Sequence, residues 1–259
     1  MSDPSVYIVG LNDMATATAI RLYRAGIKVA CVAPNGQPDI FSHRNFSAVP
    51  VLGRRERYGV VCRTCADYVY HTDDAPGETY AIMRRILAER HIPCLSIGEW
   101  QEMHFEYPPW LFVLENPDGL TTHNGVSYAL RGVDFPLARL YVCRNGEVAY
   151  PFTDLEEWNR DEETEGILKT SGEGIVQTIK KPGEAVRCGE PVLRINKHNI
   201  CAQMDGVLEG VLPSGSFVSN GQPVARILEK GRCPVYKLPV ASQAVAGAFL
   251  ELYLYLKKV

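Results

Sequence analysis

The apolar residues of the first 115 positions form short runs that alternate with segments of helical period. The run at 29–33, Val-Ala-Cys-Val-Ala, is wholly apolar, which is typical of a strand covered on both faces. Gly26 follows a helical segment directly, as a terminating glycine does. This alternation predicts a Rossmann-like α/β domain with a parallel sheet. The expected strands are 5–9, 28–33, 59–62, 67–70, 92–97 and 110–114, and the expected helices are 13–24 and 78–90.

A second pattern, an internal repeat, dominates the chain after position 170. Residues 174–195 and 206–227 align without a gap at an offset of 32, with eight of 22 positions identical. Each copy alternates apolar and polar residues around a turn that contains Gly183 or Gly215, so a positive φ is expected at both glycines. A repeat of this size cannot bury its own apolar face, so we expect the two copies to bury each other.

The repeat resembles the biotinyl/lipoyl-carrier fold, also called the barrel-sandwich hybrid. In carrier members of that family, the hairpin between the two halves presents a lysine that is modified. The equivalent joint here is 196–205, where Lys197 is the candidate carrier lysine. Because this joint lacks the flanking methionines of carrier proteins, we expect neither biotin nor lipoate on Lys197.

These patterns predict an α/β Rossmann-like domain, then a small all-β lipoyl-like domain and a C-terminal helix. The expected boundaries are 1–152 for the α/β domain, 153–165 for an acidic linker, and 166–230 for the β domain. The linker is assigned from seven acids and one base at 154–165. Residues 231–259 end in an apolar helix that is expected either to return to the first domain or to form a homo-oligomer interface.

The turn after the first strand is the candidate nucleotide site, because a Rossmann fold binds phosphate there. That site needs three spaced glycines, but only Gly10 remains here, followed by Asn12, Asp13 and Ala15. Asn12 places a side chain where the pyrophosphate would lie, and Asp13 adds a charge that repels phosphate. Two interpretations stay open: a degenerate nucleotide site formed by these four residues, or a purely architectural turn.

Two further groups are candidates for ligand chemistry. Cys62 and Cys65 form a single C-x-x-C, which is a weak metal or redox candidate because a zinc site needs two more ligands. We therefore expect no metal site. Arg44, Arg54 and Arg55 form a basic cluster near the expected carboxyl edge of the sheet, where open α/β sheets bind ligands. They are candidates for holding an anion, and solvated surface arginines are the alternative.

Charge and composition exclude some classes of function. The net charge is −3, so nothing suggests a nucleic-acid surface. No apolar run approaches the length of a membrane span. The sequence begins directly with an expected strand and lacks a basic leader, so we expect a cytoplasmic protein with its eight cysteines reduced.

The chain also resembles a family, the YqeB-like accessory proteins of selenium-dependent molybdenum hydroxylase systems. The resemblance rests on segment 8–26, on the run 43–51, on the repeat with its short joint, and on the tail 237–254. It implies a role in hydroxylase maturation. The residues of segment 8–26 that match the family are Gly10, Asp13, Ala15, Thr16, Arg21, Leu22, Arg24, Ala25 and Gly26.

Three functions are therefore considered. The first is a non-catalytic accessory or scaffold protein that binds a protein partner, either an oxidoreductase or its maturation machinery. The second is a nucleotide- or NAD(P)-dependent enzyme that uses the turn at 10–15. The third is a group carrier through Lys197. The lost glycines and the missing carrier signature both favour the first, so an enzymatic role is not expected.

Overall fold

The structure is a computed structural model that divides into two compact units. It describes residues 3–34, 36–72, 78–103, 110–114, 128–131, 142–144, 147–149, 166–229 and 235–257. The first unit contains 1–36, 49–158 and 238–259, and the second contains 37–48 and 159–237. The expected linker at 153–165 lies outside the described residues. The division differs from our expected boundaries because 37–48 belongs to the second unit.

The first unit contains most of the expected α/β elements. The predicted strands at 5–9, 28–33, 59–62, 92–97 and 110–114 and both predicted helices are confirmed within a few residues. Its elements are β1 (Val6–Val9), α1 (Asp13–Arg24), β2 (Val29–Ala33), α2 (Val49–Leu52), β3 (Arg54–Arg57), β4 (Val60–Thr64), α3 (Cys65–Thr72), α4 (Thr79–Ala88), β5 (Ile92–Ser96), α5 (Ile97–Gln101), β6 (Trp110–Val113), β7 (Tyr128–Arg131), β8 (Val142–Arg144), β9 (Glu147–Ala149) and α7 (Val240–Lys257).

Seven strands of the first unit form one mixed sheet in the order β3-β4-β5-β2-β1-β6-β7. Every neighbouring pair is parallel except β3 and β4, which are antiparallel. β1 lies between β2 and β6. Strands β2 to β5 follow β1 in the chain and lie on one side of it, and β6 and β7 lie on the other side. Strands β8 and β9 form a separate antiparallel pair.

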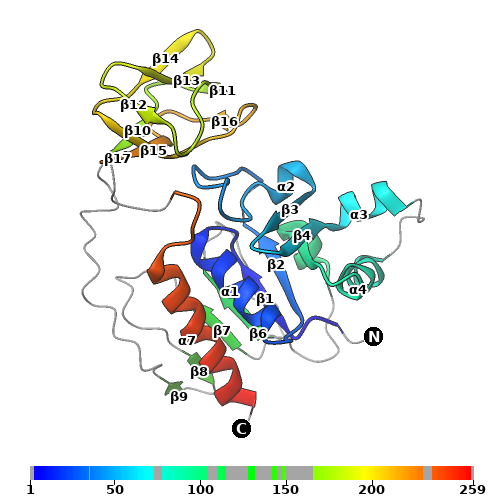
Figure 1. Ribbon diagram of the computed structural model, residues 1–259. Helices are drawn as coiled ribbons and strands as arrows, with labels where there is room; N and C mark the ends of the chain where they lie inside the picture. Colours follow the sequence, from blue (N-terminus) through cyan, green and yellow to red (C-terminus); the bar gives the residue numbers. More distant parts are fainter. Residues whose placement is uncertain are drawn as a thin grey trace. The chain divides into compact units, whose positions relative to one another are not determined.

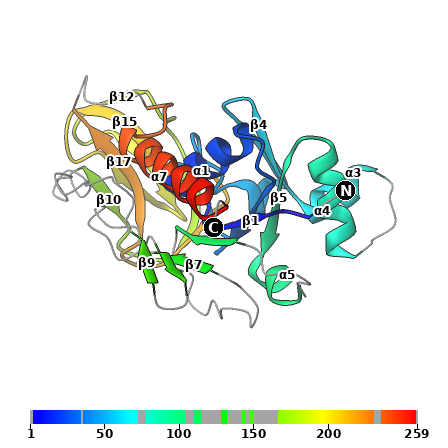
Figure 2. The same cartoon turned by 90° about the horizontal axis from the view of Figure 1, so that it is seen from below.

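Helices cover both faces of this sheet (Figures 1 and 2). On one face, Tyr7 of β1 packs against Trp100 of α5, with 4.8 Å between the ring centroids, in a cluster that includes residues of α3 and α4. On the other face, Phe112 of β6 lies 4.7 Å from Phe249 of α7, measured between ring centroids. The alternation of side chains along each strand thus supplies two cores, one on each side of the sheet.

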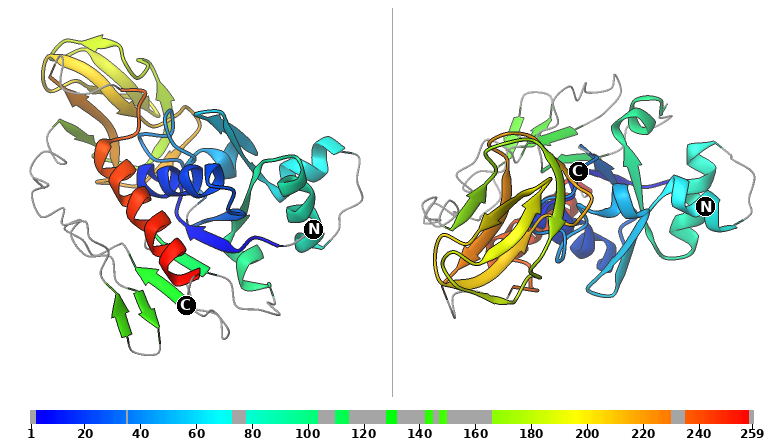
Figure 3. Two further views of the ribbon diagram at one scale, coloured as in Figure 1. Left: turned by 60° about the horizontal axis from the view of Figure 1, so that its bottom comes forward. Right: turned by 90° about the horizontal axis from the view of Figure 1, so that it is seen from above.

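The C-terminal helix α7 packs beside α1, as Figure 3 shows from a second direction. Its Tyr253 lies 6.1 Å from Trp110, between ring centroids, and its Gly247 lies next to the guanidinium of Arg21. The apolar tail thus packs on the first unit, which is one of the two interpretations drawn from the sequence. Packing of α7 on α1 and β6 buries part of its apolar surface, including Ala246, Phe249 and Leu252.

One expected strand of the first unit is a helix. We predicted a strand at 67–70, but these residues lie in α3. Thr64 accepts a hydrogen bond from the Asp67 backbone N–H at 3.1 Å, which caps the helix start. Asp67 also bonds Arg63 and lies 3.2 Å from His71, four residues on. The i, i+4 contacts and the cap override the β-branched and aromatic character of the segment.

Strands dominate the described part of the second unit, 37–48 aside. Eight strands within 166–229 form two antiparallel sheets, in the orders β10-β17-β15-β12 and β14-β13-β11-β16. Gly183 and Gly215 have φ of 89° and 91°, so the predicted positive φ is confirmed at both turns. The strands are β10 (Ile167–Lys169), β11 (Gly174–Thr178), β12 (Ala185–Val186), β13 (Pro191–Ile195), β14 (His198–Cys201), β15 (Gly206–Val211), β16 (Phe217–Val218) and β17 (Pro223–Leu228).

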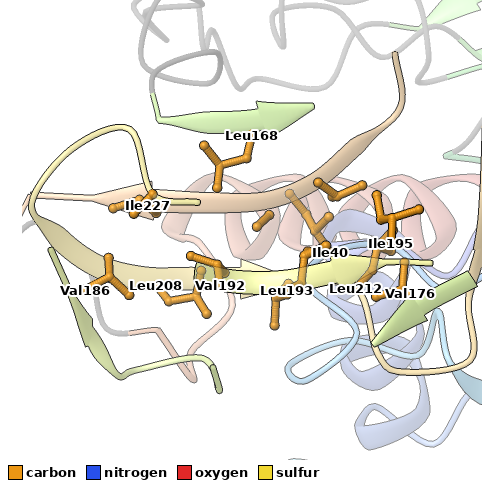
Figure 4. Packing of buried hydrophobic residues seen from close by; sticks show 14 of the residues in the cluster. Ile40, Leu168, Val176, Val186, Val192, Leu193, Ile195, Leu208, Leu212 and Ile227 are labelled. Carbon is orange, nitrogen blue, oxygen red and sulfur yellow. The ribbon is translucent and has the colours of Figure 1, made fainter. Parts of the chain in front are cut away.

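The two copies of the repeat exchange strands. β12 of the first copy pairs with β15 of the second, and β16 of the second pairs with β11 of the first. The exchange is symmetric at the level of single bonds: the Gly183 N–H donates to the Leu208 carbonyl, and the Gly215 N–H donates to the Val176 carbonyl. Side chains from both copies form one core (Figure 4), so the expectation that each copy buries the other is confirmed.

The repeat is longer in the structure than in the alignment. β10 pairs with β17 in the same register as β14 pairs with β13: Leu168 opposes Ala225, and Ile200 opposes Leu193, each 32 positions apart. The segment 196–205, which we interpreted as a joint outside the repeat, therefore contains the counterpart of β10. The sequence alignment did not reveal this, because 167–169 and 199–201 have no identical residue and share only their backbone pairing.

A segment from the N-terminal half completes the core of the second unit. Residues 37–48 lie between β2 and α2 in the chain, and Ile40 is buried among core residues of both sheets (Figure 4). The segment is folded on itself: the Asp39 carboxylate accepts hydrogen bonds from the Phe41 N–H, the Asn45 amide and the Ser47 hydroxyl. Asp39 thus fixes a compact turn that presents Ile40 to the β domain.

An ion pair buried within the second unit ties this segment to β15. The guanidinium of Arg44 donates to the Glu209 carboxylate at 2.9 Å, and the two side chains are 2% and 4% exposed. Arg226 of β17 lies 3.4 Å from the second carboxylate oxygen, and the Arg44 guanidinium also stacks over the Phe41 ring at 4.2 Å. A buried carboxylate is tolerated only when it is paired in this way.

We expect Arg44→Ala to destabilise the second unit strongly, because it leaves the Glu209 carboxylate buried with a single cation nearby. Losing one partner of a buried ion pair costs about 3–5 kcal/mol. Hydrogen–deuterium exchange should show this loss as faster exchange of the β15 and β17 amides, with α1 unchanged. Arg187→Ala, which removes an exposed arginine of the same unit, is the control. Equal protection of β15 in both variants would contradict the expectation.

Candidate docking surface and the predicted ligand sites

The turn between β1 and α1 lies where the strand order reverses, between β2 on one side and β6 on the other. Open α/β sheets bind ligands at this point. Gly10 has φ of 127°, a conformation that favours glycine. Asn12 is the N-cap of α1, and its carboxamide oxygen accepts from the Ala15 N–H at 3.0 Å. Its carboxamide nitrogen donates to the Leu114 carbonyl after β6 at 3.4 Å.

The Asn12 side chain therefore occupies the N-terminus of α1. A bound phosphate needs the free N–H groups of the helix start, and here one of them is already bonded to Asn12. Asp13 stands in the first turn of the helix, where its charge suits the helix dipole and opposes a phosphate. A nucleotide at Gly10, Asn12, Asp13 and Ala15 stays a prediction, and these contacts favour the architectural interpretation of the turn.

The three arginines proposed for an anion occupy different surroundings. Arg44 is the buried partner of Glu209 in the second unit. Arg54 and Arg55 are neighbours on β3, opposite Arg63 and Cys62. Successive side chains of a strand point to opposite faces, so the backbone directs Arg54 and Arg55 apart, and an anion held by them stays a prediction.

Arg57 belongs to the same basic run, although it was not among the arginines predicted to hold an anion. Arg57 lies on the same face as Arg55, two residues along β3. Burial, together with the charge of Arg55, lowers the pKa of Arg57 to about 10. Four charged residues in a row do not indicate a strand, so the sequence did not predict β3. Without the strand, the alternation that places Arg55 and Arg57 on one face could not be used.

Cys62 and Cys65 lie on opposite faces of the sheet. Cys62 is fully buried on β4 beside Cys31 and Cys94, and burial followed by these neighbouring thiols raises its pKa. Cys65 begins α3 and belongs to the core on the other face, where burial and then the charge of Glu99 raise its pKa to about 12. The thiolate is the reactive and metal-binding form, so both environments oppose redox or metal chemistry.

Metal-binding and membrane-spanning features are absent from the described parts of the chain. No group of three or more His, Cys, Asp or Glu side chains there is placed to hold a metal ion. No described helix combines the length and the apolar character needed to cross a bilayer.

Lys197 lies at the tip of the β13–β14 hairpin. Ile195 and His198 form the last pair of the hairpin, so Asn196 and Lys197 make a two-residue turn. Asn196 has φ of 53°, as this kind of tight turn requires, and Lys197 is exposed. The expectation that Lys197 carries neither biotin nor lipoate stays a prediction, since an exposed position suits a solvated surface lysine and a carrier lysine alike.

The outer face of β11 and β16 carries exposed large apolar side chains. Ile175 of β11 and Phe217 of β16 are directly paired and are 51% and 46% exposed. Ile179, just after β11, is 43% exposed. We call Ile175, Ile179 and Phe217 the apolar strip. Single exposed apolar residues are ordinary, whereas adjacent ones on two strands mark a candidate interaction surface.

A polar row lies beside the apolar strip on the same sheet. Gln177 of β11 opposes Arg194 of β13, which in turn opposes Asn199 of β14. The side chain of Arg194 is exposed and donates to the Asn199 carboxamide oxygen at 3.0 Å. Among the described residues, no carboxylate pairs with Arg194, so its charge is available to a ligand.

The sequence interpretation missed this surface although it had aligned the residues that form it. Ile175 and Ile179 align with Val207 and Val211, and apolar residues at both positions suggested equal burial. In the structure Val211 is buried, whereas Ile179 is exposed. The one available signal was the change from Glu209 to Gln177, which indicates that the two copies face different surroundings.

Comparisons with known proteins give no functional assignment. No protein-family model matches the chain, and no curated protein matches it. One solved structure with partial similarity is the product-bound ectoine utilization protein EutE (DoeB) from Ruegeria pomeroyi, at 17% identity and a TM-score of 0.22. The similarity covers 24% of this chain and 21% of that one, and at this TM-score it carries no argument.

We expect NAD(P), FAD and ATP at millimolar concentration to leave the melting temperature of the protein unchanged, because Asn12 already bonds the start of α1. Thermal-shift measurements test this directly. Asn12→Ala should lower stability by about 1 kcal/mol through loss of the cap. A saturable rise in melting temperature with any of the three nucleotides would contradict the architectural interpretation and restore the nucleotide site.

The thiols should differ sharply in reactivity. At pH 8 a thiol with a pKa of about 12 is thiolate in only about one molecule in ten thousand, so Cys65 should resist iodoacetamide, and fully buried Cys62 should do the same. Cys188 is exposed and should react first among Cys31, Cys62, Cys65, Cys94, Cys188 and Cys201. Mass spectrometry of tryptic peptides from native and denatured protein gives the order of labelling. Early labelling of Cys62 or Cys65 would revive the redox hypothesis.

Proposed function

We propose that the protein is a non-catalytic accessory protein that acts by binding a protein partner. We further infer that the first unit is Rossmann-like and that the second is a barrel-sandwich hybrid of lipoyl type. Support for the first comes from β1–α1–β2 with parallel pairing. Support for the second comes from two repeated hairpins that exchange strands around a shared core.

The apolar strip is the observation that carries the proposal. Ile175 and Phe217 are paired across two strands and remain about half exposed, on a sheet whose other face is a packed core. Such a surface costs free energy in water, at roughly 25 cal/mol per Å² of apolar area. A partner that covers the strip recovers this free energy, as apolar interface cores do.

The groups expected to carry chemistry support the same proposal. The Asn12 amide caps α1, Arg44 pairs with Glu209, and the Cys62 and Cys65 thiols are buried with raised pKa values. Each is thus engaged in holding the fold. The structure gives none of them the exposed, activated environment that a nucleophile or general base needs.

The resemblance to YqeB-like accessory proteins supplies the proposed partner. It suggests a molybdenum hydroxylase or a component of its maturation machinery, inside the cytoplasm. In this proposal the two units form binding surfaces and no cofactor is transferred through Lys197.

Affinity purification of the tagged full-length chain from its native cells tests the proposal. We expect one protein to co-elute in stoichiometric amount, identified by mass spectrometry as an oxidoreductase or one of its maturation factors. Multi-angle light scattering should then give the mass of a complex. The proposal is wrong if the chain elutes by itself at its monomer mass of 28.8 kDa under conditions in which its neighbours are expressed.

A further inference from the structure

No described residue of the second unit covers the outer face of β11, β13 and β16, whereas a segment of that unit covers its counterpart in the other half of the repeat. We propose that it binds an extended segment of the partner protein, with apolar side chains on the apolar strip and a carboxylate on Arg194. This inference rests on the proposed function, since it names the chemistry by which a partner is recognised.

The first argument comes from the second copy of the repeat, where a segment covers the corresponding face. Residues 37–48 come from outside the repeat and pack on β15 at Gly210. A Cβ at Gly210 would lie 2.6 Å from the Ile40 carbonyl oxygen and 2.8 Å from the Phe41 ring. Gly210 therefore allows backbone to approach this face closely. The fold thus already contains one example of the docking that we propose.

The second argument is the charge of the paired residues. Arg226 of β17 and Arg194 of β13 are 32 positions apart and hold equivalent places in their sheets. Arg226 lies 3.4 Å from the Glu209 carboxylate, which sits at a bulge of β15. Gln177 takes the aligned position opposite Arg194 and brings no charge. Because the chain supplies a carboxylate to one arginine and not to the other, a partner's carboxylate completes the second site.

The third argument is the apolar strip beside Arg194. In the second copy, Ile40 fills the core and Phe41 lies over Gly210. On the face of β11 and β16, Ile175 of the first copy and Phe217 of the second form an apolar surface two strands wide. An extended peptide can lay an apolar pair on these two side chains while a nearby acid reaches Arg194. Arginine binds carboxylates in a two-bond geometry, which gives this contact its specificity.

Peptide selection on the full-length protein tests the inference. A displayed library of random nine-residue peptides is selected on the wild-type chain, and the enriched peptides are synthesised with a fluorescent label. We expect enrichment of an acid at a fixed spacing from an aliphatic–aromatic pair. In fluorescence anisotropy, Phe217→Ser and Arg194→Glu should each weaken binding at least tenfold. A peptide whose acid is replaced by lysine should regain affinity for Arg194→Glu.

Matched variants provide the controls. Tyr70→Ser removes an exposed aromatic of the first unit, and Arg187→Glu reverses an exposed charge of the same repeat. Both should bind like wild type, and circular dichroism melting should show all four variants folded. Binding that survives Phe217→Ser and Arg194→Glu, or a selection without a common motif, overturns the inference.

Two further outcomes separate this inference from the proposed function. A co-purified partner that stays bound to Phe217→Ser and Arg194→Glu keeps the accessory role and overturns this surface. Self-association of the wild-type chain that Phe217→Ser abolishes, measured by light scattering over a range of concentrations, makes a second copy the occupant and overturns the peptide.

Discussion

The second unit depends on the buried ion pair between Arg44 and Glu209. The pair joins a segment of the N-terminal half to a β domain that begins more than a hundred residues later. Ile40 of the segment 37–48 fills part of the β-domain core, and Arg44 and Arg226 neutralise Glu209. The segment and the β domain therefore each depend on the other. The β domain is therefore not an independent module, although its repeat suggests one, and its stability is linked to the integrity of the turn fixed by Asp39.

The same ion pair breaks the symmetry of the repeat. Two copies that exchange strands would present two equivalent outer faces, but a bulge at Glu209 and a glycine at 210 adapt one face to the segment 37–48. The other face keeps Gln177, Arg194 and the apolar strip exposed. A duplicated fold can thus use one face for its own stability and leave the other for a partner. This asymmetry connects the energetics of the fold to the proposed accessory role.

In the first unit, the chain's own side chains make contacts at the edge where open α/β sheets bind ligands. Its sheet places the β1–α1 turn at the usual binding edge, yet Asn12 caps the helix and bonds the end of β6. The helix α7, which arrives from the far end of the chain, covers the sheet beside α1. The C-x-x-C is divided between the two faces of the sheet, which removes any shared chemistry of its thiols.

The sequence by itself determined the local elements and the repeat. The βα units, the glycines at 183 and 215 and the 32-residue offset follow from periodicity and turn chemistry, which act over a few residues. Only tertiary structure decided that 67–70 is helical, that 37–48 belongs with the β domain, and that Ile179 is exposed whereas its counterpart Val211 is buried. The reason is physical: burial and ion pairing depend on residues far apart in the chain, and no local pattern records which of two similar faces will be covered.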